Sequence, residues 1–459
     1  MNSVFTARGT ANAVPIWFVT EATYPEVRGL IGADVCAFAD AAGFEPKAGR
    51  HLFLPGKAGL GGVLFGLEGA DEASDPFLPG RLPQQLPDGV YRFANDPRDA
   101  RLAALAFALG SYSFTRYHKS EGHNVKLDLP QSVDRDDLQR IVEGVALARD
   151  LINTPANDMG PADLEAEARK LAKNHGAEIR VIVGDDLLAH NFNLIHAVGR
   201  AAAATAAPRL IDMVWGDSKH PRVTLVGKGV CFDTGGLDIK PDAGMLNMKK
   251  DMGGAATALA LAHMIMSRKL PVRLRVLIPA VENSIAGGSF RPRDIYTSRK
   301  GITVEIGNTD AEGRLILADA LALADEEKPE LIADFATLTG AARVALGPEL
   351  PAFFTDDDAL AGELTTCGLA ENDPVWRLPL WRPYEAMLES KVADVNNVGS
   401  SGQAGANTAA LFMRRFVTAK SWLHFDVFAW TPSAKSGRPE GGECQAARAL
   451  YALVGSRYG

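Results

Sequence analysis

Two acids and a base occupy alternate positions in the short stretch NTDAEGR, residues 308–314, as Asp310, Glu312 and Arg314. The run before them, ITVEIG, alternates like a strand, and the run after them, LILADALALA, has helical spacing. The charges are therefore predicted to lie in a strand-to-helix turn. In an open α/β sheet such a turn lies at the carboxyl end of a strand, where ligand sites form. The alternative explanation for these acids is structural: negative charge at the N-terminus of a helix interacts favourably with the helix dipole.

A second charged stretch, residues 227–251, also begins where an apolar segment, VTLV, ends. It contains Lys228, Asp233, Lys240 and Asp251 among several glycines. Glycines allow a backbone to fold tightly around a bound ion, and acids mixed with lysines are an uncommon lining for a purely structural turn. This second stretch therefore favours a functional site over the alternative that the acids only stabilise the start of a helix.

The two stretches together, GKGVCFDTGGLDIKPDAGMLNMKKD and NTDAEGR, resemble the leucyl aminopeptidase (cytosol aminopeptidase) family of metallopeptidases. The similarity continues through ATLTGA (336–341), ADVNNVGSSGQAGANTAALF (393–412) and WLHFDV (422–427). It covers residues 145–455 and is weak in the part of the chain before them.

The resemblance implies a site for two divalent ions, Zn²⁺ or Mn²⁺. Its five ligands would be Lys228, Asp233, Asp251, Asp310 and Glu312. One ion would contact all of these except Asp310, and the other would contact Asp233, Asp310 and Glu312. Four carboxylates balance two dications, and without metal the clustered acids would raise one another's pKa values. Lysine can act as a ligand only after it loses a proton; an ion-pairing lysine is the alternative for Lys228.

The resemblance also implies roles for residues that do not bind metal. Lys240 would stabilise a tetrahedral oxyanion, and Arg314 would hold a bicarbonate ion that shuttles a proton. A salt bridge to Glu312 or a neighbouring carboxylate is the alternative for Arg314. Met248, Thr337 and Gly340 match positions that line the family's substrate side-chain pocket; ordinary packing near a strand end is the alternative for Met248 and Thr337.

The predicted function is a metal-dependent aminopeptidase that releases single N-terminal residues, with a leucine-type preference, through a hydroxide activated by two metals. Its substrates would be peptides with a free N-terminus, and the resemblance implies a homohexamer. A two-metal phosphoesterase is the alternative reaction, although phosphoryl sites usually add arginines and these stretches contain only Arg314. DNA binding as a second, regulatory role is another alternative, but a net charge of −8 argues against nucleic acid as the main partner.

Strand-like and helix-like segments alternate after residue 178, which predicts an α/β fold with a mostly parallel central sheet flanked by helices. We expect a smaller N-terminal α/β domain at 1–135, a linker helix at 136–152 and a catalytic domain at 153–459. The glycine-rich GKAGLGG lacks a phosphate-loop ending and is predicted to form a hairpin or strand-edge loop. Four separated cysteines indicate no disulfide framework, and the start of the chain has no signal-peptide pattern, so we expect a cytoplasmic location without membrane spans.

Overall fold

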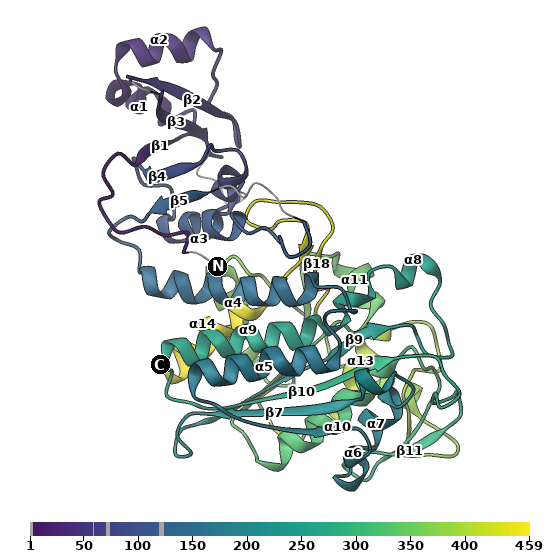
Figure 1. Ribbon diagram of the computed structural model, residues 1–459. Coiled ribbons are helices and arrows are strands. Elements are labelled where there is room, and N and C mark those ends of the chain that lie inside the picture. Colours follow the sequence, from purple (N-terminus) through teal and green to yellow (C-terminus); the bar gives the residue numbers. More distant parts are fainter. Residues whose placement is uncertain (1–2, 58, 70–73, 119–123) are drawn as a thin grey trace. The chain divides into compact units, whose positions relative to one another are not determined.

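The computed structural model describes residues 3–57, 59–69, 74–118 and 124–459 (Figure 1). The chain divides into two compact units, Met1–Ala146 with Ser433–Glu440, and Leu147–Pro432 with Gly441–Gly459. The division falls within helix α4 (Arg135–Asn153), which matches the helix expected at 136–152. The expected domain boundaries themselves stay a prediction.

The first unit contains a five-stranded sheet in the order β2-β3-β1-β4-β5. Its strands are β1 (Val14–Val19), β2 (His51–Gly56), β3 (Gly59–Gly66), β4 (Gly89–Phe93) and β5 (Val125–Asp128). Its other helical segments are α1 (Tyr24–Ile31), α2 (Ala33–Ala41), the 3-10 helix η1 (Leu78–Gln84) and α3 (Ala100–Gly110). Strands β2 and β3 pair antiparallel, so the predicted hairpin is confirmed, although Ala58 in its turn lies outside the described residues. A Cβ on Gly61 would lie 2.7 Å from the Gly56 Cα, which explains the glycines there.

The second unit is built on a nine-stranded sheet in the order β15-β14-β17-β13-β8-β10-β7-β6, with β9 also paired to β10. Its strands are β6 (Glu178–Val183), β7 (Arg209–Trp215), β8 (Arg222–Gly227), β9 (Gly229–Asp233), β10 (Arg273–Asn283), β13 (Leu331–Ala336), β14 (Ala352–Phe354), β15 (Trp376–Arg377) and β17 (Trp422–Asp426). The central strands β17, β13, β8 and β10 run parallel, whereas β7 pairs antiparallel with β10, β6 antiparallel with β7, and β14 antiparallel with β17. The predicted mostly parallel sheet is confirmed.

Helices cover both faces of this sheet (Figure 1). One face carries α5 (Pro161–His175), α9 (Gly253–Arg268) and α14 (Ala447–Tyr458), and the other carries α7 (Asn193–Gly199), α10 (Glu312–Glu326) and α13 (Gly405–Arg414). The remaining helical segments are α6 (Asp186–Ala189), η2 (Ala204–Ala206), α8 (Asp242–Met245), η3 (Met248–Met252), α11 (Gly340–Leu346), α12 (Asp358–Ala370) and η4 (Arg382–Leu388). Coverage on both faces explains why β8 and β13 are apolar and buried along almost their whole length.

Helix α9 lies unusually close to the sheet because it begins with two glycines, Gly253 and Gly254. A Cβ on Gly254 would lie only 2.0 Å from the carbonyl oxygen of Phe335 on β13. A Cβ on Gly227, at the end of β8, would likewise lie 2.5 Å from the Ala255 Cα. The start of α9 is therefore held directly against the carboxyl ends of two central strands.

The strand before NTDAEGR lies outside the central sheet. It is β12 (Thr303–Glu305), part of a three-stranded sheet with β11 (Ile295–Thr297) and β16 (Val395–Asn396), and β18 (Trp430–Thr431) pairs with β19 (Gly441–Gly442) elsewhere. The strand-to-helix turn at 308–314 is present, but the expectation that its strand belongs to the main open sheet was wrong. The central strands are apolar on both faces, whereas the alternating ITVEIG pattern suits a strand with only one buried face.

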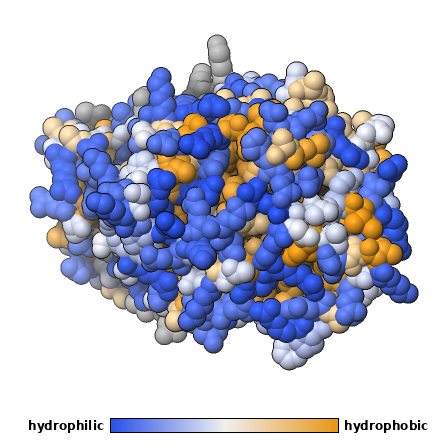
Figure 2. All heavy atoms as spheres, turned by 90° about the horizontal axis from the view of Figure 1, so that it is seen from below, coloured by the Kyte–Doolittle hydropathy of each residue, from blue (hydrophilic) through white to orange (hydrophobic). Residues whose placement is uncertain are grey.

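The surface is mainly hydrophilic on the face drawn in Figure 2, with several separate apolar patches between polar areas. Isolated apolar patches of this kind are normal on globular proteins. Within the described residues, no helix combines the length and the apolar character that crossing a membrane requires.

Candidate metal centre

Lys228 stands at the break between strands β8 and β9, which both run parallel to β10. Its N–H donates to the carbonyl oxygen of Phe335 at 2.9 Å, and its own carbonyl accepts from the N–H of Ala255 at 2.9 Å. Gly313 leaves room for the side chain, because a Cβ there would lie 2.6 Å from the lysine Cε. The lysine is thus fixed between the sheet and the first turns of two helices.

Four acids from three separate segments surround this lysine. Asp233 ends β9, Asp251 lies in η3, and Asp310 and Glu312 come from the turn and first residue of α10. Carboxylate oxygens of Asp233, Asp310 and Glu312 all lie within 4.8 Å of one another. The structure therefore brings together the five residues predicted to be metal ligands.

Two lysines interact with these acids. The Lys228 ammonium lies 2.8 Å from Asp251 Oδ2 and 2.9 Å from Glu312 Oε1, and it donates to the Thr337 carbonyl oxygen at 2.8 Å. The Lys240 ammonium lies 2.8 Å from Asp233 Oδ2 and also contacts the carboxylate of Asp310. Two lysines cannot neutralise four carboxylates, so an excess of negative charge remains in a buried place.

The pKa values reflect this excess. Burial, followed by the charge of Asp251, raises the pKa of Asp233 to about 6. Burial, followed by the charge of Asp233, raises the pKa of Glu312 to about 7. Burial alone would lower the pKa of Lys228, but the neighbouring carboxylates outweigh burial and raise it above its ordinary value. The metal-free cluster therefore holds protons that a bound cation would displace.

The cluster suits divalent cations by its donor atoms. Both carboxylate oxygens of Glu312 are buried without a hydrogen bond inside the described part of the chain, although Oε1 lies at ion-pair distance from Lys228. Buried acceptors of this kind are rare unless a ligand satisfies them. Carboxylate oxygens together with one amine nitrogen form a donor set that first-row divalent ions accept.

Arg314 is buried beside the cluster but is not among the residues that line the cavity described below. Its Nη1 donates to the Asn397 carbonyl oxygen at 2.7 Å, and its Nε has no hydrogen-bond partner among the described residues. Burial lowers the pKa of Arg314 to about 10. No ion pair of Arg314 is found in the described residues, so the alternative of a salt bridge to Glu312 is not supported.

The cluster opens into a cavity of about 450 Å³. Met248, Thr337 and Gly340, the predicted pocket residues, line it together with Lys240. The Thr337 hydroxyl donates to Asp251 Oδ1 at 2.8 Å, which ties this wall to the cluster. The predicted pocket and the predicted ligands therefore belong to one site.

Sequence reasoning missed three further lining residues, Lys250, Arg343 and Phe428. Lys250 is buried, and its ammonium lies 4.9 Å from the centroid of the Phe428 ring. Burial lowers the pKa of Lys250 to about 8. The doublet KKD was the available signal, because a second lysine beside a predicted ligand adds charge next to a metal.

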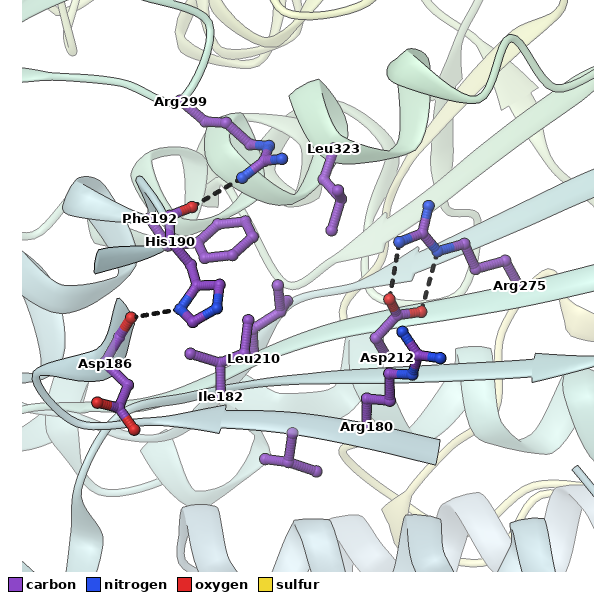
Figure 3. Close-up of a pocket in the computed structure, with 11 residues that line it drawn as sticks. Arg180, Ile182, Asp186, His190, Phe192, Leu210, Asp212, Arg275, Arg299 and Leu323 are labelled. Carbon is purple, nitrogen blue, oxygen red and sulfur yellow. Dashed lines mark hydrogen bonds and ion pairs between the residues drawn. The ribbon is translucent and has the colours of Figure 1, made fainter. Parts of the chain in front are cut away.

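A second cavity, of about 510 Å³, lies over β6, β7 and β10 (Figure 3). Its charged groups bind one another: Arg275 donates to both oxygens of Asp212, at 2.9 and 2.7 Å, and Arg299 donates to the His190 carbonyl oxygen at 2.9 Å. Ring Nδ1 of His190 lies 2.9 Å from the Asp186 carbonyl oxygen. Because its charged groups bind one another, this cavity resembles an ordinary surface groove more closely than a metal or catalytic site.

Comparison with known proteins decides the family. Residues 146–451 match the model of the cytosol aminopeptidase family, catalytic domain, and residues 14–130 match that of the M17 aminopeptidase N-terminal domain. The chain belongs to the cytosol aminopeptidase family. It is therefore a metal-dependent aminopeptidase, a peptide hydrolase, as the sequence predicted, in a family whose members use a dinuclear metal centre.

Relatives within this family match most of the chain. A probable cytosol aminopeptidase of Rhizobium johnstonii is 42% identical over 354 residues, covering 74% of this chain and 71% of that protein. One from Roseiflexus castenholzii is 42% identical over 351 residues, covering 72% of this chain and 71% of that protein.

Solved structures share the fold. The crystal structure of the cytosol aminopeptidase from Coxiella burnetii matches with a TM-score of 0.94 and 47% identity, covering 99% of this chain and 100% of that one. The bottromycin maturation enzyme BotP in complex with Mn matches with a TM-score of 0.86 and 31% identity, covering 97% of this chain and 99% of BotP. The two-unit α/β architecture is thus confirmed.

Proposed function

We propose that this aminopeptidase releases single N-terminal residues, with a leucine-type preference, and uses two divalent ions held by Lys228 and the four acids. The observation that carries the proposal is the group of three carboxylates within 4.8 Å of one another beside a buried lysine. Two bound ions would supply a hydroxide nucleophile near neutral pH and polarise the substrate carbonyl. Zn²⁺ or Mn²⁺ is the proposed metal.

Within this proposal, each side chain has a task that its position supports. Asp233 and Glu312, buried and central, would bridge the two ions, and Asp251 would bind one of them. The Lys240 ammonium lines the cavity and would donate hydrogen bonds to the oxyanion that develops from the substrate carbonyl. Lys240 would turn from Asp233 and Asp310 toward the substrate once cations neutralise those acids.

Arg314 has a free donor that supports a different task. Its Nε is buried without a hydrogen-bond partner in the described residues, so an anion could bind there at little further desolvation cost. We propose that Arg314 holds bicarbonate, which takes a proton from the nucleophile and returns it to the leaving amine. A homohexameric assembly and a cytoplasmic location are also proposed, on the family resemblance alone.

The family membership supports neither alternative function, phosphoester hydrolysis or DNA binding. Both remain outcomes of the same test. The protein, reloaded with Zn²⁺ or Mn²⁺, is incubated with Leu-Gly and with N-acetyl-Leu-Gly, and released amino acid is measured. We expect cleavage of the free dipeptide only, because the substrate's α-amine must be unblocked. Equal cleavage of both dipeptides, or hydrolysis of a phosphate ester in place of either, would overturn the proposal.

A further inference from the structure

A buried lysine outside the acidic cluster lines the same cavity as that cluster. Lys250 lies in η3 and is only 5% exposed. The Phe428 ring is its contact, and no hydrogen bond or ion pair of its ammonium is found in the described part of the chain. Burying an ammonium without an anionic partner is strongly unfavourable. A missing partner therefore suggests a ligand.

A second cation lies against the same aromatic ring. The guanidinium carbon of Arg343, in the short helix α11, is 4.8 Å from the centroid of Phe428. Arg343 is exposed, lines the same cavity, and has no ion pair among the described residues. A cation over an aromatic ring is stabilised only modestly, and this offsets only part of the cost of burying Lys250.

The neighbouring lysines show that this arrangement is specific to Lys250. Lys228 and Lys240 are both paired with carboxylates of the cluster. Lys249 donates to the Asn153 carbonyl oxygen at 2.7 Å and does not line the cavity. The cavity thus holds an acidic cluster suited to cations, and beside it two cations, Lys250 and Arg343, that make no ion pair within the described residues.

We propose that Lys250 and Arg343 bind a carboxylate of the peptide substrate, so that the enzyme accepts acidic peptides in addition to leucine-type ones. This inference rests on the proposed function, because the peptide must occupy this cavity with its reacting bond at the acidic cluster. The buried Lys250 would supply a single positive charge, and the exposed Arg343 could add two parallel hydrogen bonds to the same carboxylate. The carboxylate could belong to an N-terminal Asp or Glu side chain or to the C-terminus of a dipeptide.

Four amidated or free dipeptides separate these sources. Leu-Gly-amide carries no carboxylate and measures the basic activity, and Leu-Gly adds only the C-terminal carboxylate. Glu-Gly-amide adds only the side-chain carboxylate, and Gln-Gly-amide is its neutral isostere. The metal-loaded protein should show a higher kcat/KM for the carboxylate-bearing member of one pair.

Lys250→Met removes the charge while keeping an unbranched side chain of similar length. Two ratios of kcat/KM are compared, Glu-Gly-amide over Gln-Gly-amide and Leu-Gly over Leu-Gly-amide. Whichever of them is raised in the wild type should fall by about tenfold or more in this variant. Lys250→Arg should keep the ratio, and Arg343→Met, at an exposed position, should lower it without disturbing the buried wall. Lys249→Met is the matched control and should leave the ratio unchanged.

Failures of the two proposals look different. Wild-type protein that does not cleave Leu-Gly-amide would contradict the proposed function itself. Wild-type protein that cleaves Leu-Gly-amide but favours neither carboxylate would overturn the carboxylate site alone. Lys250→Met could instead lower kcat/KM equally for all four dipeptides while Arg343→Met keeps the wild-type ratio. That result would mean that Lys250 only supports the Phe428 ring, and it would also overturn the carboxylate site.

Discussion

Nζ of Lys228 lies 2.9 Å from Oε1 of Glu312, and the side chains are only 3% and 1% exposed. In this metal-free arrangement the ammonium neutralises part of the charge that divalent ions would neutralise in the loaded enzyme. The pKa of Lys228 is raised by its acidic neighbours, so the lysine carries a proton throughout the neutral range. Lys228 can become a ligand only if the incoming ion displaces that proton.

Metal binding at pH 8 should therefore release about one proton more from the wild type than from Lys228→Gln. At this pH most of the protons on Glu312 and Asp233 are already gone, because the pKa values of these acids are about 7 and about 6. Titration calorimetry in buffers of different ionisation enthalpy measures the proton count. Loss of the Lys228 charge raises the pKa of Glu312 in the variant, so the count is repeated at pH 9; identical counts for the two proteins at both pH values would show that Lys228 stays an ammonium and is not a ligand.

Substitution should separate ligands from groups that act only on the substrate. Asp251→Ala and Glu312→Ala should lose bound metal and activity together, since each removes an oxygen from the cluster. Lys240→Ala should retain metal and lose turnover by on the order of a hundredfold. Metal content by elemental analysis, measured beside kcat, checks the division. An empty site in Lys240→Ala would assign that lysine to metal binding.

The metal-free protein should lose stability as the pH rises toward neutrality. The folded-state pKa of Glu312 is raised from 4.5 to about 7, so between these values the folded state holds a proton that the unfolded chain releases. Unfolding therefore becomes easier as pH rises through this window. Urea unfolding of chelator-treated protein at pH 5 and pH 7.5 should show a larger decrease for the wild type than for Glu312→Gln. An equal decrease in both would mean that Glu312 does not carry the effect.

The close approach of α9 to the sheet should make Gly254 intolerant of any side chain. Gly254→Ala would bring a Cβ within 2.0 Å of the Phe335 carbonyl oxygen, a backbone atom that cannot move aside. We expect a loss of stability of about 1–3 kcal/mol or more, together with reduced metal binding, because α9 holds Lys228. Gly362→Ala, in α12 with open space around it, is the control and should be neutral or slightly stabilising. Thermal unfolding compares the two, and equal melting temperatures would contradict this packing argument.

The local character of NTDAEGR could be predicted from the sequence, because a strand pattern, a charged turn and a helix pattern follow one another within a few residues. The sheet to which its strand belongs could not, because ITVEIG carries no information on its partners; β12 pairs with β11 and β16 instead of the central strands. The end of β8 before Lys228 could be predicted, because the apolar run VTLV stops there; the second strand, β9, that follows directly and also pairs with β10 could not. Only the family resemblance joined the two charged stretches before the structure did.

Contacts between distant segments were out of reach of pattern analysis. Lys250, Arg343 and Phe428 meet around one ring, yet they come from η3, from α11 and from the loop after β17. Lys250 was marked only by its place in the doublet KKD, and Arg343 and Phe428 by no periodicity or spacing. Their position in the cavity became visible only when the sheet brought the carboxyl ends of its strands together.

Our central proposal is that Lys228 and the four acids around it hold two divalent ions. Crystals of the protein loaded with Zn²⁺ or Mn²⁺, measured at the absorption edge of that metal, test it directly. We expect two anomalous peaks a few ångströms apart, one near Lys228, Asp233, Asp251 and Glu312 and the other near Asp233, Asp310 and Glu312. A single peak, or peaks away from these carboxylates in an active crystal preparation, would contradict it.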